Sequence, residues 1–506
     1  MKKIKTTFLS LLIILTMGGC SDWLDVNRNP NALSETDNAE IIVPAAQLNI
    51  ANALMGWDIG FAGAFYSQYW TQIHIASQFK FLDEYEETDF SYAYFNLVPG
   101  ALNDLKRIKS IAEEGSGEYY VGEVLSIFAW QLLTDLWGDI PYSEALGGEE
   151  GTFSPKFDDQ QSIYTDLLAR IDALLAEDYS EANLVADYDF IYHGDMELWI
   201  EFARSLKLKL MLRLSETSGY DNSAVLAFVE EGGLLSTTAM IPGDVWEAKD
   251  SKQHPMVEFD AGSAGYISGN VIASRTMIEY LRTTGDPRLD VLYVAPSSGT
   301  HKGSFQGDFA ADESVDSDGN GTPDQDEEYS TVEFAVETPL PLMSVWEVQY
   351  NMAEVYARAG MDTEAKAAYD AGVQASLDFW GISGSITGAG EYAEWESGTI
   401  EESIEQISMQ RWVSFCKLQH GEAWLSRNRT KYPAVDPIDV AADRQNAHLN
   451  FPAGKFTFSV AGRARLSDRL PASPIYPNEV VTRNTTNPSQ KTNMAQKVWW
   501  DQKAGI

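Results

Sequence analysis

Twelve consecutive residues, 316 to 327, supply the oxygen ligands that a calcium ion needs on one short arc of chain. They read Asp-Ser-Asp-Gly-Asn-Gly-Thr-Pro-Asp-Gln-Asp-Glu. Calcium loops of this length place oxygen ligands at positions one, three, five, seven, nine and twelve, with a glycine at position six for the sharp turn. The spacing therefore predicts a structural Ca²⁺ site formed by Asp316, Asp318, Asn320, Thr322, Asp324 and Glu327.

The surroundings of this loop differ from those of an EF-hand. No helical pattern flanks it, and Pro323 stands where such loops usually have an apolar residue. The segment is more similar to the calcium loops of thrombospondin-type or dockerin-like repeats. We expect the ion to order a long surface loop and not to take part in catalysis, and the alternative is a solvated acidic loop without metal.

The other reactive side chains do not form a known catalytic motif. The six histidines are scattered, and the sequence contains no His-Glu-x-x-His pair, no Gly-x-Ser-x-Gly elbow and no Walker loop. Cys416 lies between apolar residues, which is typical of a packed thiol. The sequence leaves open a pair of carboxylates for glycoside hydrolysis, because the distance between two such groups depends on the folded structure. The sequence predicts a protein that is not an enzyme, with glycoside hydrolysis as the alternative.

Aromatic side chains are abundant, with 14 Trp, 23 Tyr and 22 Phe. Rings that stack on pyranose faces, next to polar groups that bind hydroxyls, are the usual means of sugar recognition. The densest polar and aromatic run is Phe65 to Gln72. Burial in the core is the alternative for every one of these rings. The ligand contacts that we predict are Trp70, Phe81, Tyr85, Trp246 and Tyr266.

The first twenty residues are typical of a bacterial lipoprotein signal. Three lysines precede an apolar run from Phe8 to Met17, and Met17-Gly18-Gly19-Cys20 resembles a lipobox. The run is too short for a permanent transmembrane helix. We therefore expect residues 1–20 to be the signal, with Cys20 lipidated at the start of the mature protein. An ordinary secretory signal is the alternative.

The formal net charge of −39 at pH 7 limits the classes of partner. Such a chain repels nucleic acids and anionic membrane surfaces, so membrane attachment must come from the lipid. Neutral or cationic ligands fit better. With Cys20 acylated, Cys416 has no cysteine to pair with. We predict no intramolecular disulfide, and stability must come from an apolar core.

Helical periodicity predicts a scaffold in two blocks, residues 39–215 and 340–430 approximately. The remaining segments, about 216–339 and 431–506, contain frequent glycine, serine and proline and are predicted to be rich in loops. The clearest amphipathic segments are 119–137, 161–175 and 198–214, the last with its long basic side chains on the outer face. Within the first loop-rich block, 271–282 is predicted to be one short helix.

A helical hairpin is predicted at residues 346–359 and 363–377, broken at Gly360. The spacing Tyr356, Gly360, Ala365 and Tyr369 resembles a tetratricopeptide unit, in which a small residue lets an aromatic ring of the facing helix pack closely. A generic helical hairpin is the alternative.

Short motifs along the whole mature chain resemble those of SusD/RagB-type outer-membrane nutrient-binding lipoproteins of the Bacteroidetes. The early Asn-Pro-Asn segment and the segment from Leu342 to Gly360 are closest to the second SusD-like subgroup of that family. Each motif alone is weakly specific. The whole set, in this order and after a lipobox, is highly specific. They are Asn27–Asn31, Asp135–Leu146, Trp199–Leu208, Asp286–Leu289, Ala353–Tyr356, Gln410–Trp412, Glu422–Leu425, Arg469–Pro471, Tyr476–Glu479 and Val498–Asp501.

The resemblance implies a mostly α-helical fold, with tetratricopeptide-like helix pairs as scaffold and a loop-rich remainder that binds the ligand, in a single domain over 21–506. It also implies a cell-surface lipoprotein, anchored by its lipid in the outer membrane and facing the exterior. Such a protein delivers an oligosaccharide, or sometimes a peptide, to a SusC-like TonB-dependent transporter without catalysis. The alternatives are a surface glycoside hydrolase and a scaffold that binds only protein or peptide.

Overall fold

The computed structural model describes residues 38–260, 265–309, 316, 319–323, 327–486 and 489–506. Cys20 and two of the predicted calcium ligands, Asp318 and Asp324, lie outside the described residues. Among the described helices, none is both long and apolar enough to cross a membrane.

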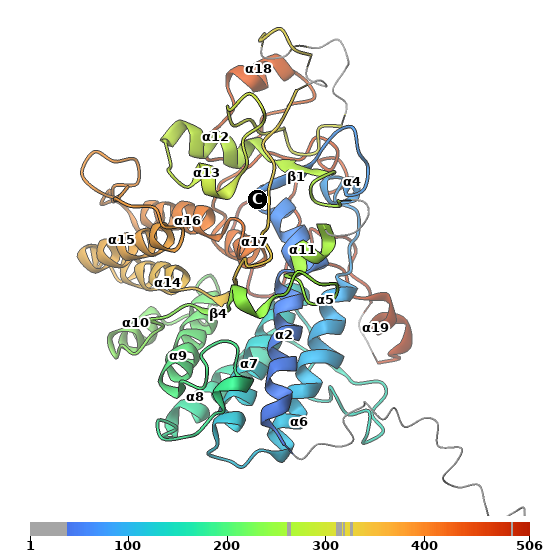
Figure 1. Cartoon of the computed structure of the whole chain (residues 1–506), viewed down its shortest axis with the longest axis vertical. Helices are drawn as coiled ribbons and strands as arrows, with labels where there is room; N and C mark the ends of the chain where they lie inside the picture. The colour runs from blue at the N-terminus through green and yellow to red at the C-terminus, as the bar shows by residue number, and fades with distance from the viewer. Residues whose placement is uncertain (1–37, 261–264, 310–315, 317–318, 324–326, 487–488) are drawn as a thin grey trace, which may run out of the picture.

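Long helices form one end of the molecule, and short elements joined by loops form the other (Figure 1). The apolar side chains of both helical blocks belong to one continuous buried core. The main scaffold helices are α2 (Val43–Leu54), α6 (Asn103–Ile111), α7 (Gly117–Trp137), α8 (Gln160–Ala176), α9 (Met196–Arg213), α14 (Val345–Arg358), α15 (Asp362–Phe379), α16 (Ile400–Phe415) and α17 (His420–Thr430).

In the described part of the chain, shorter helices and three two-stranded antiparallel sheets connect this scaffold. The sheets pair β1 (Trp70–Gln72) with β5 (Val271–Ala273), β2 (Ile140–Pro141) with β3 (Phe157–Asp158), and β4 (Ala239–Ile241) with β6 (Leu340–Met343). The short helices are α3 (Gly63–Tyr66), α4 (Lys80–Asp83), α5 (Ser91–Phe95), α10 (Asn222–Glu230), α11 (Pro255–Asp260), α12 (Arg275–Thr284), α13 (Leu289–Leu292), α18 (Arg444–Leu449) and α19 (Asn478–Arg483), with single turns η1 (Glu40–Ile42), η2 (Trp57–Ala62), η3 (Asn96–Leu102), η4 (Ala186–Tyr188) and η5 (Gly243–Val245).

Helix α7 confirms the segment predicted at 119–137. The Ser116 hydroxyl caps it by accepting a hydrogen bond from the backbone N–H of Tyr119 at 3.2 Å. Gly138 ends it with φ +80°, a conformation that favours glycine. Nearly every residue of α7 is buried, so it is the central helix of the first block.

Helices α14 and α15 confirm the predicted hairpin, and Gly360 turns the chain between them with φ +73°. A Cβ atom at Gly372 would lie 2.9 Å from Cε1 of Tyr350 on the facing helix. The absence of a side chain at Gly372 therefore lets the Tyr350 ring pack directly against the backbone of α15. This contact is of the predicted small-against-large kind, but neither Gly372 nor Tyr350 belongs to the predicted spacing Tyr356, Gly360, Ala365 and Tyr369.

Two predictions about the first loop-rich block were wrong. Residues 271–282 are not one helix, because β-branched Val271 and Ile272 pair as β5 with β1, and α12 begins only at Arg275. The block also contains α10, whose cap residue Asp221 accepts hydrogen bonds from the backbone N–H groups of Ser223 and Ala224. The side-chain cap made this helix predictable.

The prediction that α9 turns its basic side chains outward was also wrong for two of them. The side chains of Lys209 and Arg213 are 7% and 3% exposed. Lys209 Nζ lies 2.8 Å from carboxylate oxygens of both Glu347 and Glu422, and Arg213 Nε lies 2.9 Å from Asp135. A buried cation needs such partners, and they come from other helices. Periodicity within α9 could not reveal them.

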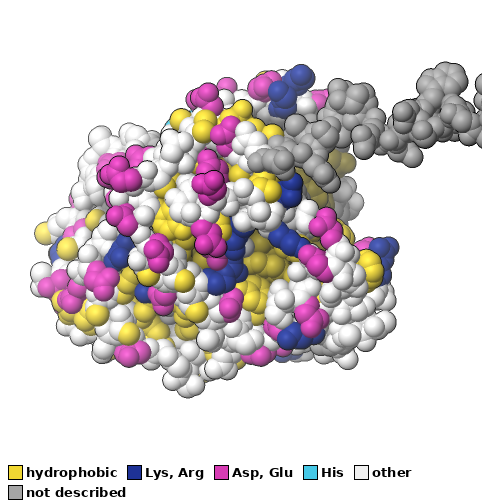
Figure 2. All heavy atoms as spheres, turned by 90° about the horizontal axis from the view of Figure 1, so that it is seen from below, with side chains coloured by type: hydrophobic (Ala, Val, Ile, Leu, Met, Phe, Trp, Pro, Cys, Tyr) yellow, Lys and Arg dark blue, Asp and Glu magenta, His cyan; other side chains and the backbone are white. Residues whose placement is uncertain are grey.

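Seen from the end formed by the long helices, the surface has acidic side chains scattered over it, while basic side chains gather around an apolar hollow (Figure 2). A groove of about 590 Å³ on α7 and α8 is lined by Glu123 and Arg170 among others. The Arg170 guanidinium already donates to both oxygens of Glu123, at 2.7 and 2.9 Å, and to the Tyr142 hydroxyl at 2.8 Å. Its charge is therefore used within the scaffold.

Candidate functional site

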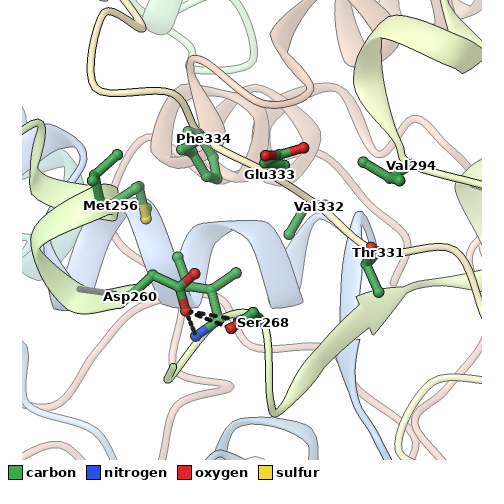
Figure 3. Close-up of a pocket in the computed structure, with 10 residues that line it drawn as sticks. Met256, Asp260, Ser268, Val294, Thr331, Val332, Glu333 and Phe334 are labelled. Carbon is green, nitrogen blue, oxygen red and sulfur yellow. Dashed lines mark hydrogen bonds between the residues drawn. The ribbon is translucent and has the colours of Figure 1, made fainter. Parts of the chain in front are cut away.

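A pocket of about 370 Å³ opens where the short elements meet beside α11 (Figure 3). Three separate segments form it: α11 with Ile267 and Ser268, Val294 two residues after α13, and the extended residues 331–334 that precede β6. Its lining residues are Met256, Val257, Asp260, Ile267, Ser268, Val294, Thr331, Val332, Glu333 and Phe334.

Backbone hydrogen bonds join the walls of this pocket. The N–H of Val294 donates to the carbonyl of Thr331 at 2.9 Å, and the N–H of Thr331 donates back at 3.1 Å. The N–H of Ala273, at the end of β5, donates to the carbonyl of Ser330 at 2.8 Å. The extended wall is thus attached to the β1–β5 sheet and is held in position before any ligand binds.

Asp260, the last residue of α11, organises the opposite wall. Its Oδ1 accepts hydrogen bonds from the backbone N–H groups of Ile267 and Ser268, both at 2.9 Å, and from the Ser268 hydroxyl at 3.1 Å (Figure 3). All three bonds use the same oxygen, so within the described part of the chain Oδ2 keeps its capacity to accept a hydrogen bond from a ligand.

The lining combines apolar side chains with a few polar groups. Met256, Val294, Val332 and Phe334 supply apolar contact, and the polar groups are two hydroxyls and two carboxylates. Carboxylate and hydroxyl oxygens suit the hydroxyl groups of a saccharide, and apolar walls suit its C–H faces. The composition fits a small polar ligand with apolar faces.

A chain of aromatic rings supports Phe334 from behind. The His254 ring lies parallel to the Phe334 ring, with centroids 5.8 Å apart, and the Trp70 ring meets it edge-on at 6.0 Å. Trp246 packs on His254 at 5.7 Å, and His420 packs on Trp70 at 4.8 Å. Burial lowers the pKa of His254 to about 3 and that of His420 to about 4, so both imidazoles are neutral at physiological pH.

None of the five predicted ligand aromatics lines this pocket, but three of them lie close to its lining residues in space or in sequence. Trp70 and Trp246 belong to the supporting rings, and neither indole N–H has a hydrogen-bond partner among the described residues. The Trp70 side chain is 0% exposed, so its face is not open to a ligand in this structure. Tyr266 immediately precedes the lining loop, is 36% exposed, and packs edge-on against Phe79.

The other two predicted aromatics, Tyr85 and Phe81, pack elsewhere in the protein. Tyr85 is 3% exposed, and its hydroxyl oxygen accepts a hydrogen bond from the backbone N–H of Ser459 at 3.3 Å. Phe81 is partly buried against the core. Sequence reasoning did not single out Asp260, Ser268, Glu333 and Phe334, because no local motif contains them and only the tertiary structure brings their segments together.

Parts of the predicted calcium loop lie together. Asp316 accepts hydrogen bonds from the backbone N–H groups of Asn320 and Gly321 at 3.0 and 2.8 Å. The Asn320 side-chain amide donates to Glu327 at 2.9 Å, and Lys302 also pairs with that carboxylate. Among the described residues, no three His, Cys, Asp or Glu side chains form a metal cluster. The oxygen donors suit a hard cation, and the calcium site remains a prediction.

Cys416 is the packed thiol that its sequence context predicts. It is 1% exposed, with its sulfur 3.5 Å from the Tyr293 hydroxyl. Burial raises the pKa of the thiol to about 12, which suppresses the reactive thiolate.

Comparisons with known proteins agree with this architecture. A family model described as "Starch-binding associating with outer membrane", of the second SusD-like type, matches residues 30–452. A comparison with curated proteins gives no match.

Among solved structures, a SusD homolog from Bacteroides uniformis superposes with a TM-score of 0.68 at 21% identity, covering 91% of this chain and 99% of that one. A SusD homolog from Bacteroides thetaiotaomicron gives a TM-score of 0.67 at 19% identity, covering 92% and 100%. A chitin-binding SusD homolog from Flavobacterium johnsoniae gives 0.66 at 19% identity, covering 92% and 99%. These similarities establish the fold, and the family match over most of the chain establishes that the protein belongs to the SusD-like family.

Proposed function

We propose that this protein captures a glycan in the pocket between α11 and residues 331–334, without cleaving it. The observation that supports this most directly is the lining itself, which joins the apolar surface of Phe334 to the open carboxylate oxygen of Asp260 and the hydroxyl of Ser268. The family description, starch-binding, and the chitin-binding relative of the same fold point to the same class of ligand.

We further propose that the bound glycan passes to a SusC-like TonB-dependent transporter, and that a lipid on Cys20 anchors the protein in the outer membrane, facing the exterior. The family description, associating with the outer membrane, supports this location. Labelled palmitate should enter the wild-type protein and not Cys20→Ser, and the variant should leave the membrane fraction. Purification from the native membrane should recover the transporter with the wild-type protein.

The test of capture is calorimetric titration of the protein beginning at Ser21 against a panel of oligosaccharides. We expect saturable binding of one glycan class, with intact polymer recovered afterwards. Phe334→Ala should weaken that binding at least about tenfold, the loss of roughly 1.4 kcal/mol of contact. Phe153→Ala is the matched control, because Phe153 is 80% exposed and does not line the pocket. An equal effect of both variants would contradict the assignment of the site.

The presence of two carboxylates in one pocket, Asp260 and Glu333, makes glycoside hydrolysis the alternative function. Product analysis of the same mixtures separates the two. Released sugars that disappear in Asp260→Asn would establish the enzyme. If no glycan of the panel binds and peptides do bind, the result would favour a peptide-binding scaffold.

We also propose that Ca²⁺ binds at residues 316–327, through ligands that include Asp316, Asn320 and Glu327. The described part of this loop supplies carboxylate and amide oxygens within one short segment. Glu327 lies four residues before Thr331, so an ion there would order the chain that leads into the pocket wall.

A further inference from the structure

The lining of the pocket contains negative charge and no positive charge. Of its ten residues, Asp260 and Glu333 are acids, and none is Lys, Arg or His. They stand on opposite walls, Asp260 at the end of α11 and Glu333 on the extended segment (Figure 3). A ligand that enters between these walls comes close to both carboxylates.

Neither carboxylate is neutralised by a salt bridge within the described residues. Asp260 accepts hydrogen bonds only from uncharged groups, two backbone amides and the Ser268 hydroxyl. Glu333 is exposed and makes no hydrogen bond or ion pair with another described residue. Both acids therefore keep their charge available to a ligand.

Lys417 is a cation close to this wall, but it does not line the pocket. Its ammonium donates to the backbone carbonyl of Val291 at 3.1 Å and lies over the rings of Trp380 and Phe334, 5.5 and 6.0 Å from their centroids. Phe334 is itself a lining residue, whereas Lys417 is not. Burial lowers the pKa of Lys417, and the negative charge of Glu333 partly offsets this shift.

From this arrangement we infer that the pocket binds saccharides with free ammonium groups, such as amino sugars, in preference to their neutral or acidic counterparts. The inference rests on the proposed function, because it names the charge class of the captured glycan. An ammonium group gains favourable contact with Asp260 Oδ2 and Glu333, whereas a uronate or sulfate group is repelled by both. Specificity then comes from attraction of one charge class and rejection of the other.

The test uses three probes of similar length: a β-1,4-linked glucosamine hexamer, its fully N-acetylated form and a hexagalacturonate. At pH 6 and 0.15 M salt, we expect the glucosamine hexamer to bind about tenfold tighter than its acetylated form, as two partly exposed ion pairs allow. The hexagalacturonate should show no binding.

Variants separate the pocket from the general acidity of the protein. Asp260→Asn with Glu333→Gln should bring the affinities for the two chitin-type hexamers to within about twofold of each other. The control, Glu364→Gln with Glu479→Gln, removes the same charge from two exposed acids on α15 and α19 and should keep the tenfold preference. Thermal unfolding of each variant confirms that it is folded.

Two results overturn the inference. One is that the glucosamine hexamer binds no tighter than its acetylated form, and the other is that the pocket and control variants change the preference equally. If either occurs while a glycan of the wider panel still binds, capture stands and only the charge preference fails. If no glycan of any class binds, the proposed function fails as well.

Discussion

Arg429 on α17 donates hydrogen bonds to both carboxylate oxygens of Glu354 on α14, at 2.5 Å to Oε1 and 2.6 Å to Oε2. Glu354 is 0% exposed and also binds Arg411 on α16 at 3.2 Å and Arg358 at 3.0 Å. Burial alone would raise the pKa of Glu354, but Arg429 and the other two guanidinium groups hold it well below its ordinary value. One carboxylate thus joins three helices of the scaffold.

Glu354→Gln should lower the free energy of unfolding by about 3 to 5 kcal/mol, because it leaves buried guanidinium groups without their counter-charge. Urea unfolding followed by circular dichroism measures this loss. Glu364→Gln, at an exposed position of α15, is the control and should stay within about 0.5 kcal/mol of the wild type. A loss below about 1 kcal/mol in Glu354→Gln would show that the cluster does not stabilise the scaffold.

Asp83 should make stability fall as the pH rises toward neutrality. Burial raises the pKa of Asp83 from 3.8 to about 7, although Gln72, Thr71 and Gln306 donate hydrogen bonds to its carboxylate. The folded state then binds a proton that the unfolded state has lost. This contribution is complete below pH 3.8 and disappears as the pH rises through 7.

The advantage of the wild type over Asp83→Asn should therefore shrink between pH 5 and pH 7, by up to about 1.4 kcal/mol per pH unit. Urea titrations at pH 5, 6, 7 and 8 measure it. Asp187→Asn, an exposed acid on η4, should show no such trend. A constant difference at all four pH values would mean that Asp83 is ionised throughout.

Gly421→Ala should destabilise the contact between α17 and η2. A Cβ atom at position 421 would lie 2.3 Å from Cγ2 of Ile59. The two backbones also approach closely at Gly63, where a Cβ atom would lie 2.9 Å from the Gly421 nitrogen, so α17 has no room to shift. We expect a loss of about 1 to 3 kcal/mol in the free energy of unfolding.

The control for this substitution is Gly148→Ala, because a Cβ atom there meets no other atom within 4 Å. It should be neutral within about 0.5 kcal/mol. Equal melting temperatures for the two alanine variants would show that α17 and η2 can separate without cost.

Cys416 should be inert toward thiol reagents in the folded protein. Its sulfur is buried and its pKa is raised to about 12, so thiolate is scarce and access is blocked. Protein that begins at Ser21 contains only this cysteine. Ellman's reagent at pH 8 should detect no thiol before denaturation and one thiol per chain in guanidinium chloride. Fast labelling of native protein would contradict the packing.

Calcium should raise the melting temperature of the wild type in proportion to RT ln(1 + [Ca²⁺]/Kd), and a chelator should reverse it. Glu327→Gln should abolish the response because it removes the carboxylate at position twelve. Glu337→Gln, an exposed acid beyond the loop, should retain it. Identical melting curves of the wild type with calcium and with chelator would refute the site.

Local patterns predicted the scaffold well because they depend on neighbours along the chain. Residues 119–137 and 346–377 became α7 and the α14–α15 hairpin, since apolar periodicity, a serine cap and a helix-ending glycine all act within a few turns. The same reasoning failed at 271–282, where a long-range pairing of Val271–Ala273 with Trp70–Gln72 outweighed local helix propensity.

The pocket was only partly accessible to such reasoning. Trp70, Trp246 and Tyr266 were predicted from their residue type alone, and none of them lines the pocket: Trp70 packs against Phe334, Trp246 packs against His254, and Tyr266 precedes the lining residue Ile267. Which ring is exposed depends on what packs against it, so Trp70 is buried while Phe334 lines the wall. No count of aromatics along the chain contains that information.

By itself, the sequence determined the helical class, the strong acidity, the absence of known catalytic motifs and the expectation of a lipid on Cys20, because composition and short motifs are properties of the chain. Only the tertiary structure decided that Asp260, Ser268 and Phe334 share one pocket and that Lys209 and Arg213 are buried. Burial and charge pairing depend on contacts between segments far apart in sequence, and these contacts exist only once the core has formed.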